Sequence, residues 1–454
     1  MSDIENLRDK IDKITFDMIK LLKERNDVAK EIGNLKNNLG LGVTNEEREN
    51  QLRMKVLSLC KEIGLDEKTA STFLNLLLNE SIKVQSTNKS THLSIFLKAK
   101  ALEKEGKKII HMEVGEPDFY PPKVVKSALS EVYDKGYTKY GDSKGMPEFR
   151  DALAKKVSLS YGVKIQTQNI MVSPGARFSV FLAISSLLNP GDEMIIIEPA
   201  WPAYRENALN SGIKVRTIQT TLDNKWEPSI DQIENTINSN TKMIVLNYPN
   251  NPTGKILPEK IQDEIMKIAI KNNLHVLSDE IYSNYAYKKW KSILAYEYNK
   301  SIITQSFSKS HAMTGFRIGY AVSNPDIIDK IVKLQALCIT NVAEPIQYVA
   351  LRALDADTSD NTKTIKNRLD IVIKKAKNMQ LDFVDPDGAM YLFAKVRKDN
   401  FDVTSFINNL LDLGVAIAPG EAFGNYQNFV RISACQPEDL LNEGMQIIDE
   451  TLRK

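Results

Sequence analysis

The sequence predicts an all-α N-terminal domain, followed by a larger α/β domain with a mostly parallel sheet and a smaller α+β lobe. Three observations support this fold class. The chain has 454 residues, which is too long for one compact core. Its first 85 residues contain no proline, whereas prolines recur from Pro117 onward. Beyond residue 94, apolar runs of strand length alternate with amphipathic segments of helix length, a pattern typical of a parallel α/β sheet.

These changes of pattern predict where the domains begin and end. We expect the helical domain at residues 1–86, a polar linker at 87–93 and the α/β region at 94–454. Two lobes are expected in that region: a large one at about 121–375, and a small one made of 94–120 together with 376–454.

The charge of the chain is nearly balanced, with 60 basic and 58 acidic residues. Such a chain has no long-range field that would attract nucleic acid or an anionic membrane. No apolar run approaches the ~20 residues of a membrane span, and the first ten residues are too charged for a secretory signal. We therefore expect a cytoplasmic protein that binds small molecules rather than nucleic acid or membranes.

Metal and disulfide chemistry are not expected. The cysteines Cys60, Cys338 and Cys435 lie far apart in the sequence among apolar residues, which favours buried thiols. The four histidines form no pair at the spacing of metal ligands.

The helical domain begins with one long helix. Apolar side chains recur at steps of three and four residues from Ile4 to Leu35, which predicts a helix of about 50 Å. Two shorter helices should follow near residues 45–63 and 66–85, the second one capped by Asp66. Three helices of such unequal length cannot cover both sides of the first. A second subunit is the expected cover, so we predict a homodimer or a higher homo-oligomer.

Two cations stand in the core-facing pattern of the long helix. Arg25 takes one of the apolar positions, and Lys36 lies within about 20° of the same face. A cation in a helical core costs stability unless an anion meets it. The two residues therefore indicate a site for an anionic ligand.

The residues around these cations resemble the all-helical chorismate mutases over nearly all of residues 3–85. The matching segments are Leu7-Arg8, Glu24-Arg25, Lys36, Glu47-Arg48-Glu49 and Asn79-Glu80-Ser81 through Gln85. Members of that family rearrange chorismate, a dianion, to prephenate, which needs preorganised charges rather than a nucleophile. The site residues that the resemblance implies are Arg8 and Arg25 for the two carboxylates, Lys36 and Gln85 for the ether oxygen, Glu49 for the ring hydroxyl, and Arg48 and Ser81 in support.

Two features bear on this site. Arg8 lies seventeen residues before Arg25, about 26 Å along one helix and on another face, so both can reach one ligand only across a dimer. Where the family often has an aspartate, this chain has Asn45, which keeps a hydrogen-bonding group but removes a charge. The alternative to an active mutase is a module that serves dimerisation or ligand binding.

The predicted strands of the α/β region are short apolar runs. Those of the large lobe lie at 170–172, 194–197, 243–246, 275–277, 302–303 and 318–322. Those of the small lobe lie near 391–396, 415–418 and 429–433.

One of these strands leads into the segment Ser306-Phe-Ser-Lys309-Ser-His-Ala-Met-Thr-Gly-Phe-Arg317. Lys309 should therefore lie at a strand end, where α/β proteins build their sites. The segment resembles the lysine motif of the fold-type I pyridoxal-phosphate aminotransferases, the aspartate aminotransferase superfamily. Five further segments match that family in its order, across about residues 93–454: Val114–Phe119, Tyr140–Arg150, Asn250–Gly254, Ser278–Tyr282 and Val430–Ser433.

The resemblance implies pyridoxal 5′-phosphate as the cofactor. Lys309 would bond covalently to the cofactor aldehyde and later carry a proton between the substrate Cα and the cofactor. Asp279 would keep the pyridine nitrogen protonated, so that the ring withdraws electrons, and Tyr282 would donate to the ring hydroxyl.

The cofactor phosphate needs free amides and cations. A predicted strand and a predicted helix flank a turn, so the amides of Gly175, Ala176 and Arg177 should lie at a positive helix end. The resemblance adds four side chains: Ser306 and Arg317 on the phosphate, Trp201 on the cofactor ring, and Tyr140 from a second subunit.

An amino-acid substrate carries an α-carboxylate, which the planar guanidinium of arginine binds through two hydrogen bonds. Arg431 matches the family's arginine, and the resemblance adds Asn251 and the Gly115 backbone to the pocket. The sequence singles out no residue that selects the substrate side chain.

Together the two resemblances predict a bifunctional enzyme of aromatic amino-acid biosynthesis. It would convert chorismate to prephenate and transfer an amino group to prephenate or an aromatic 2-oxo acid, with glutamate or aspartate as the donor. One alternative is an aspartate or alanine aminotransferase whose helical domain is a regulatory or dimerisation module. A cofactor-dependent lyase that shares these motifs is a further alternative.

Overall fold

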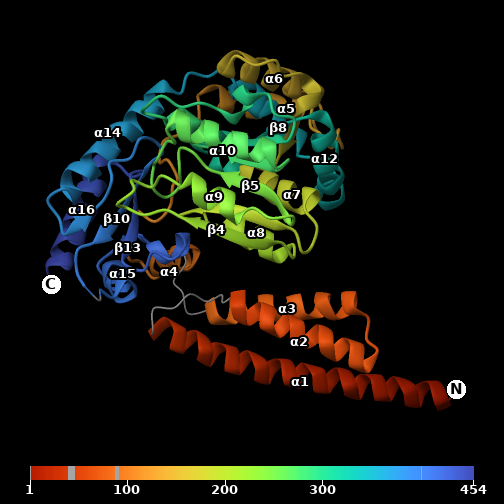
Figure 1. Cartoon of the computed structure of the whole chain (residues 1–454). Coiled ribbons are helices and arrows are strands. Elements are labelled where there is room, and N and C mark those ends of the chain that lie inside the picture. The colour runs from red at the N-terminus through yellow and green to blue at the C-terminus, as the bar shows by residue number, and fades with distance from the viewer. Residues whose placement is uncertain (1, 39–45, 87–91, 400) are drawn as a thin grey trace. The chain divides into compact units, whose positions relative to one another are not determined.

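The computed structural model describes residues 2–38, 46–86, 92–399 and 401–454. The chain forms two compact units, Met1–Lys89 and Ser90–Lys454 (Figure 1). Asn45 and residues 87–91 of the predicted linker lie outside the described residues. Within the described ranges, no helix is both long enough and apolar enough to cross a membrane.

Three helices make up the first unit, as predicted: α1 (Ser2–Asn38), α2 (Glu46–Ile63) and α3 (Glu67–Ser86). The predicted cap of α3 is confirmed, because the Asp66 carboxylate accepts a hydrogen bond from Thr69 N at 2.8 Å. α3 packs against α1 where α1 carries Gly33. A Cβ on Gly33 would lie 2.9 Å from the Cα of Gln85, so glycine allows the two helices to approach this closely.

Most of α1 keeps its apolar side chains in solvent within this unit. Nine residues of the predicted apolar pattern, here called the apolar stripe, are 42–63% exposed: Ile4, Leu7, Ile11, Ile14, Met18, Leu21, Val28, Ile32 and Leu35. α3 covers a neighbouring part of the helix surface, where Ala29 and Gly33 are buried. The helical unit by itself therefore leaves the stripe uncovered.

The second unit is built on a seven-stranded sheet with the order β2-β8-β7-β6-β5-β3-β4. All neighbouring strands are parallel except β8, which runs antiparallel to β2 and β7. The strands are β2 (Ile170–Ser173), β3 (Glu193–Glu198), β4 (Lys214–Gln219), β5 (Thr241–Leu246), β6 (His275–Asp279), β7 (Ser301–Ser306) and β8 (Gly319–Ser323). The six predicted strands and the predicted fold class are confirmed.

Helices cover both faces of this sheet (Figure 1). On β3, Ile195 and Ile197 enter one core, whereas Met194 and Ile196 enter the other. The first core includes α5 (Val124–Asp134), α6 (Pro147–Tyr161), α10 (Glu259–Lys271) and α13 (Glu344–Ala353). The second includes α7 (Ala176–Leu187), α8 (Ala203–Asn210) and α12 (Pro325–Ile339). Burial on both faces explains why the predicted strands are nearly continuous apolar runs.

The sequence-based prediction missed β4, one of the two edge strands of this sheet. Its sequence, Lys-Val-Arg-Thr-Ile-Gln, buries only Ile218. The opposite edge strand, β2, is buried along its whole length, whereas β4 keeps most of its side chains partly in solvent. β4 therefore lacks the apolar run that marks the other six strands.

A smaller sheet of order β12-β13-β10-β9 forms the second lobe of this unit. Its strands are β9 (Leu381–Asp382), β10 (Tyr391–Val396), β12 (Ala418–Pro419) and β13 (Phe429–Ser433). A separate pair consists of β1 (Ile110–His111) and β11 (Val415–Ala416). Helices α4 (His92–Lys104), α14 (Ser359–Ala376), α15 (Val403–Asp412) and α16 (Glu438–Arg453) complete the lobe and share its core.

All three cysteines are free, but the prediction that all are buried is wrong for one of them. Cys60 and Cys435 are buried, whereas Cys338 is exposed. Cys338 lies in the last turn of α12, an amphipathic helix that buries Ile327, Ile328 and Ile331 and turns other positions to solvent.

Candidate active site

Lys309 lies directly after the sheet strand β7, in the single helical turn α11 (Phe307–Ser310). Ser306 caps that turn by accepting a hydrogen bond from Ser308 N at 2.9 Å. The Lys309 Nζ donates to the carbonyl oxygen of Gly115 at 2.5 Å. Burial lowers the pKa of this amine, which increases the fraction of the neutral, nucleophilic form.

Asp279 ends the neighbouring strand β6 and is 4% exposed. The Tyr204 hydroxyl donates to Asp279 Oδ2 at 2.7 Å, and the Thr304 hydroxyl donates to Oδ1 at 3.2 Å. Burial raises the pKa of Asp279, and these two hydrogen bonds oppose that rise. A buried carboxylate is stabilised when a positive charge lies next to it. A protonated nitrogen of the cofactor ring would supply that charge to Asp279.

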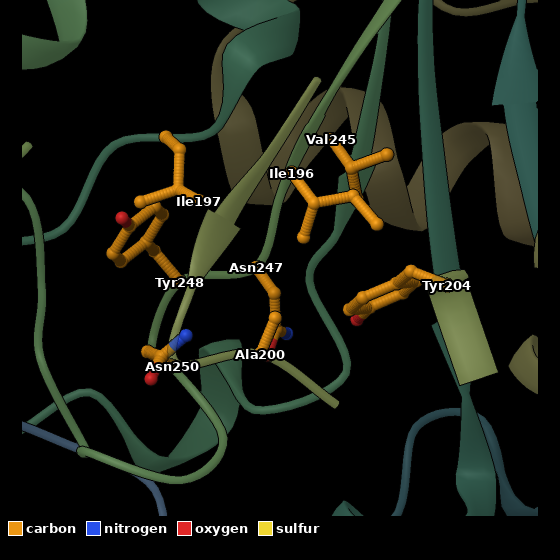
Figure 2. A pocket seen from close by; sticks show the side chains of 8 residues that line it. All are labelled: Ile196, Ile197, Ala200, Tyr204, Val245, Asn247, Tyr248 and Asn250. Atoms are coloured by element: carbon orange, nitrogen blue, oxygen red, sulfur yellow. The ribbon is translucent and has the colours of Figure 1, made fainter. Parts of the chain in front are cut away.

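Figure 2 shows a small pocket that Tyr204, Asn247 and Tyr248 help to line. Asn247 Nδ2 donates to the backbone oxygen of Asp279 at 2.9 Å, and Asn247 Oδ1 accepts from Asn251 N at 2.9 Å. Tyr204 is absent from the sequence-based prediction. Its position three residues after Trp201 was the only available signal, and nothing in the sequence ties it to Asp279.

We expect the Tyr204→Phe variant to bind the cofactor about tenfold more weakly, because a hydrogen bond to a charged group contributes roughly 1.5–3 kcal/mol. Without this donor the pKa of Asp279 rises further, so less of the carboxylate is ionised to pair with the ring nitrogen. The measurement is a titration of the apoenzyme with pyridoxal phosphate. Tyr248→Phe is the matched control, because Tyr248 lines the same pocket and makes no hydrogen bond to Asp279. Equal affinities for Tyr204→Phe and wild type would contradict this role.

The predicted phosphate cradle lies at the start of α7, which follows β2 directly. Gly175 caps the helix with a φ of 83°, a left-handed conformation that favours glycine. A Cβ there would also lie 2.8 Å from Arg317 Nη2. The Arg317 guanidinium therefore lies at the N-terminus of α7. The backbone amides of Ala176 and Arg177 are in the first turn of that helix. This arrangement fits a phosphate.

A second arginine borders the same region. The guanidinium carbon of Arg177 lies 4.9 Å from the centre of the Trp201 ring. Burial lowers the pKa of Arg177, the nearby Glu206 carboxylate opposes that shift, and Arg317 adds to it. Tyr140, predicted to act from a second subunit, is 88% exposed in the single chain.

Arg431 lies on β13 and is 3% exposed. Its Nη1 donates to Asn251 Oδ1 at 2.8 Å, and its Nη2 donates to the carbonyl oxygen of Glu113. Among the residues that the structure describes, its Nε has no partner. A buried guanidinium whose acceptors are all neutral fits a carboxylate ligand. Tyr282, which follows β6, is also buried, with its hydroxyl oxygen 2.7 Å from that of Tyr391.

In the helical unit the structure brings Arg25 and Ser81 together. Arg25 Nη1 donates to Ser81 Oγ at 2.5 Å and to the carbonyl oxygen of Leu77 at 2.8 Å. Burial lowers the pKa of Arg25. One turn further along α3, the side-chain oxygen of Gln85 is buried and has no partner in the described part of the chain.

The other predicted residues of this unit are less enclosed. Lys36 and Glu49 are half-buried, Arg48 is exposed, and Arg8 is exposed on the N-terminal half of α1. The helical rise separates Arg8 from Arg25 by about 26 Å along the axis, so one chain does not bring the two together.

The strand order of the large sheet, with Lys309 just after β7 and Asp279 at the end of β6, places the second unit among the fold-type I pyridoxal-phosphate enzymes. The chain belongs to the family described as "Aminotransferase class I and II", which matches residues 107–448. The family described as "Chorismate mutase type II" matches residues 7–86. The chain is therefore an enzyme with both domains, and its cofactor is pyridoxal 5′-phosphate. The predicted resemblances and cofactor are confirmed.

Several related proteins span most of the chain. An aspartate aminotransferase from Thermotoga maritima is 35% identical over 370 residues, which are 80% of this chain and 96% of the relative. An aspartate/prephenate aminotransferase from Thermus thermophilus is 28% identical over 375 residues, which are 81% of this chain and 97% of the relative. The solved structure of an aspartate aminotransferase from Thermotoga maritima has a TM-score of 0.77 at 34% identity and covers 82% of this chain and 99% of that one.

Proposed function

We propose that the chain is a bifunctional enzyme of aromatic amino-acid biosynthesis. Residues 1–86 convert chorismate to prephenate, and residues 94–454 transfer an amino group from glutamate or aspartate to prephenate or an aromatic 2-oxo acid. The main support for this proposal is that both family matches occur in one chain. A chorismate mutase makes prephenate, and prephenate stands in the name of the Thermus thermophilus relative. A cytoplasmic location for the enzyme is part of this proposal.

In amino transfer, pyridoxal phosphate supplies a ring that withdraws electrons from the substrate Cα. Lys309 anchors the cofactor and moves a proton to and from that Cα. Asp279 holds the proton on the ring nitrogen, and Tyr282 donates to the ring oxygen. The lowered pKa of Lys309 supports its role, because a proton carrier must be neutral for part of the cycle.

The remaining residues of this site bind and orient. Arg431, with Asn251 and the Gly115 backbone, holds the α-carboxylate of the substrate, which the unpartnered Nε of Arg431 supports. The cofactor is held by Gly175, Ala176, Arg177, Ser306 and Arg317 at the phosphate, by Trp201 at the ring, and by Tyr140 of a second subunit.

The side chain of Arg177 adds selectivity for dicarboxylic substrates such as glutamate, aspartate and prephenate. Its guanidinium lies against Trp201, and Arg317 is the second arginine of this region. Because the helix amides and Arg317 bind the phosphate, the Arg177 side chain is left to donate to the second carboxylate of a substrate.

We expect the Arg177→Ala variant to lose about 10- to 100-fold in kcat/KM for glutamate and aspartate, the effect of removing a charged hydrogen-bond donor. For amino acids with one carboxylate, kcat/KM should change less than about threefold, because the backbone amide of residue 177 stays in place. Steady-state kinetics on both substrate classes give the comparison, with Arg177→Lys as the charge-retaining control. An equal loss for both classes would contradict the assignment and indicate a cofactor defect.

In the rearrangement no proton or nucleophile is needed, and the residues act through charge and hydrogen bonds. Arg8 and Arg25 bind the two carboxylates, Lys36 and Gln85 donate to the ether oxygen, Glu49 orders the ring hydroxyl, and Arg48 and Ser81 support them. The guanidinium of Arg25, which is held by Ser81, supports this site. The side-chain oxygen of Gln85 is buried without a partner among the described residues, which leaves this amide available to a ligand.

We also propose a homodimer or a higher homo-oligomer. The apolar stripe of α1 is 42–63% exposed within its own unit, and burying it against a second copy would be favourable at roughly 25 cal/mol per Å². The distance of Arg8 from Arg25 gives a second reason, because a partner subunit can bring Arg8 to the ligand that Arg25 binds.

The Gln85→Ala variant distinguishes a catalyst from a sensor. A neutral amide adds little to the binding of carboxylates, but it stabilises charge on the ether oxygen in the transition state. We expect kcat for chorismate to fall about 100-fold, while the dissociation constant for prephenate changes less than about threefold. Turnover of chorismate and a binding titration give the two values. If the wild type converts no chorismate yet its binding alters amino transfer, the helical unit is a regulatory module.

One alternative is supported by a specific observation. The Thermotoga maritima relative, at 35% identity, is named an aspartate aminotransferase. If this chain has that activity, its amino acceptor is a short dicarboxylic oxo acid. The helical unit then regulates the aminotransferase or serves dimerisation. A panel of oxo acids that includes oxaloacetate, 2-oxoglutarate, prephenate and 4-hydroxyphenylpyruvate separates the two functions by kcat/KM.

A further inference from the structure

Tyr391, which no sequence motif singled out, joins two parts of the proposed aminotransferase site. It lies on β10 and is 2% exposed. Its hydroxyl oxygen is 2.7 Å from that of Tyr282, and its ring centre is 4.3 Å from the guanidinium carbon of Arg431. One side chain therefore touches both the tyrosine that faces the cofactor ring and the arginine that faces the substrate carboxylate.

Packing fixes the position of this hydroxyl. A Cβ on Gly115 would lie 1.8 Å from it, so the Tyr391 hydroxyl fills the space that any other residue at position 115 would need. The same Gly115 carbonyl accepts the hydrogen bond from Lys309. Tyr391 is thus in contact with Gly115, Arg431 and Tyr282.

The direction of the hydrogen bond between the two tyrosines decides what Tyr282 can do. Each hydroxyl has one proton to donate. If Tyr282 donated to Tyr391, it would have no proton left for the cofactor. If Tyr391 donates, the Tyr282 proton is free to point at the cofactor ring oxygen. Among the described residues neither hydroxyl has another partner, so no other group competes for either proton.

We propose that Tyr391 is a positioning residue that donates to Tyr282 and thereby directs the Tyr282 hydroxyl toward the cofactor ring oxygen. The inference rests on the proposed role of Tyr282. A hydroxyl that accepts a hydrogen bond becomes a stronger donor in turn. Tyr391 therefore stabilises the bound cofactor in the form that has lost its proton, and it lowers the pH at which that proton leaves.

A pH titration of the visible absorbance of the holoenzyme tests this inference. Tyr391→Phe keeps the ring against Arg431 and removes only the hydroxyl. We expect its midpoint to rise by about 0.5 to 1 pH unit, the effect of one hydrogen bond, and that of Tyr282→Phe to rise further. The double variant should match Tyr282→Phe alone, because Tyr391 acts through Tyr282.

Tyr287→Phe is the matched control, since it removes a neighbouring hydroxyl that donates to the Ala389 carbonyl at 2.7 Å. Its midpoint should equal that of the wild type. If the midpoint rises in Tyr282→Phe but stays unchanged in Tyr391→Phe, the inference about Tyr391 is wrong. The proposed role of Tyr282 is then still supported. A further rise in the double variant would overturn it as well. No rise in Tyr282→Phe would overturn both the inference and the proposed role of Tyr282.

Discussion

The Lys309→Ala variant should lose amino transfer by at least about 10⁴-fold, because one side chain supplies both the covalent anchor of the cofactor and the proton carrier. The visible absorbance of the lysine-bound cofactor should disappear with it. Steady-state assays of amino transfer and the spectrum of the purified variant measure the two effects. An absorbance spectrum equal to that of the wild type would contradict the assignment of Lys309.

The same variant should rearrange chorismate at a rate within about twofold of the wild type. The chain forms two compact units, and Lys309 belongs to the second, whereas the mutase residues belong to the first. Retained mutase activity shows that the first unit of the variant is folded, so the loss is confined to the second unit, which carries Lys309.

Replacing Arg25 with alanine should have the opposite effect on the two activities. We expect chorismate turnover to fall by about 10³-fold, because a fixed charged donor at the ligand is lost, while amino transfer stays near the wild-type rate. Arg25 is held by Ser81 Oγ at 2.5 Å and by the Leu77 carbonyl at 2.8 Å, so its guanidinium is already oriented before a ligand binds. Parallel assays of both reactions on the purified variant give the result.

Arg53→Ala is the matched control for this variant. Arg53 also joins two helices of the same unit, through a hydrogen bond from Nη1 to Asn75 Oδ1 at 2.7 Å, and it lies outside the predicted site. It should keep most of its mutase activity. If Arg25→Ala lost both activities together, the helical unit would be needed for the assembly of the whole enzyme, and the separate-site account would be wrong.

The sequence was informative about the large sheet because six of its strands are buried on both faces. The buried part of such a strand is mostly apolar, so Met194–Ile197 in β3 and Met243–Leu246 in β5 stand out as continuous runs. The strand ends that carry Asp279 and Lys309 were predictable for the same reason. The edge strand β4 was not, since only Ile218 is buried in it.

Residues that support the site from distant segments were beyond sequence reasoning. Tyr204 on α8 bonds to Asp279, 75 positions away, and Tyr391 on β10 bonds to Tyr282, 109 positions away. Each is a buried tyrosine whose partner is set by tertiary packing rather than by local spacing. A buried tyrosine commonly finds a hydrogen-bond partner, but the sequence does not say which group it meets.

The most direct test of a bifunctional enzyme supplies chorismate and ¹⁵N-labelled glutamate or aspartate to the purified chain and follows the products by mass spectrometry. The account predicts that prephenate forms and that the label appears in the amino acid made from prephenate or from an aromatic 2-oxo acid. Lys309→Ala should stop at prephenate, and Arg25→Ala should leave chorismate unconverted. Unchanged chorismate with the wild type, together with rapid label transfer to oxaloacetate or 2-oxoglutarate, would contradict the account.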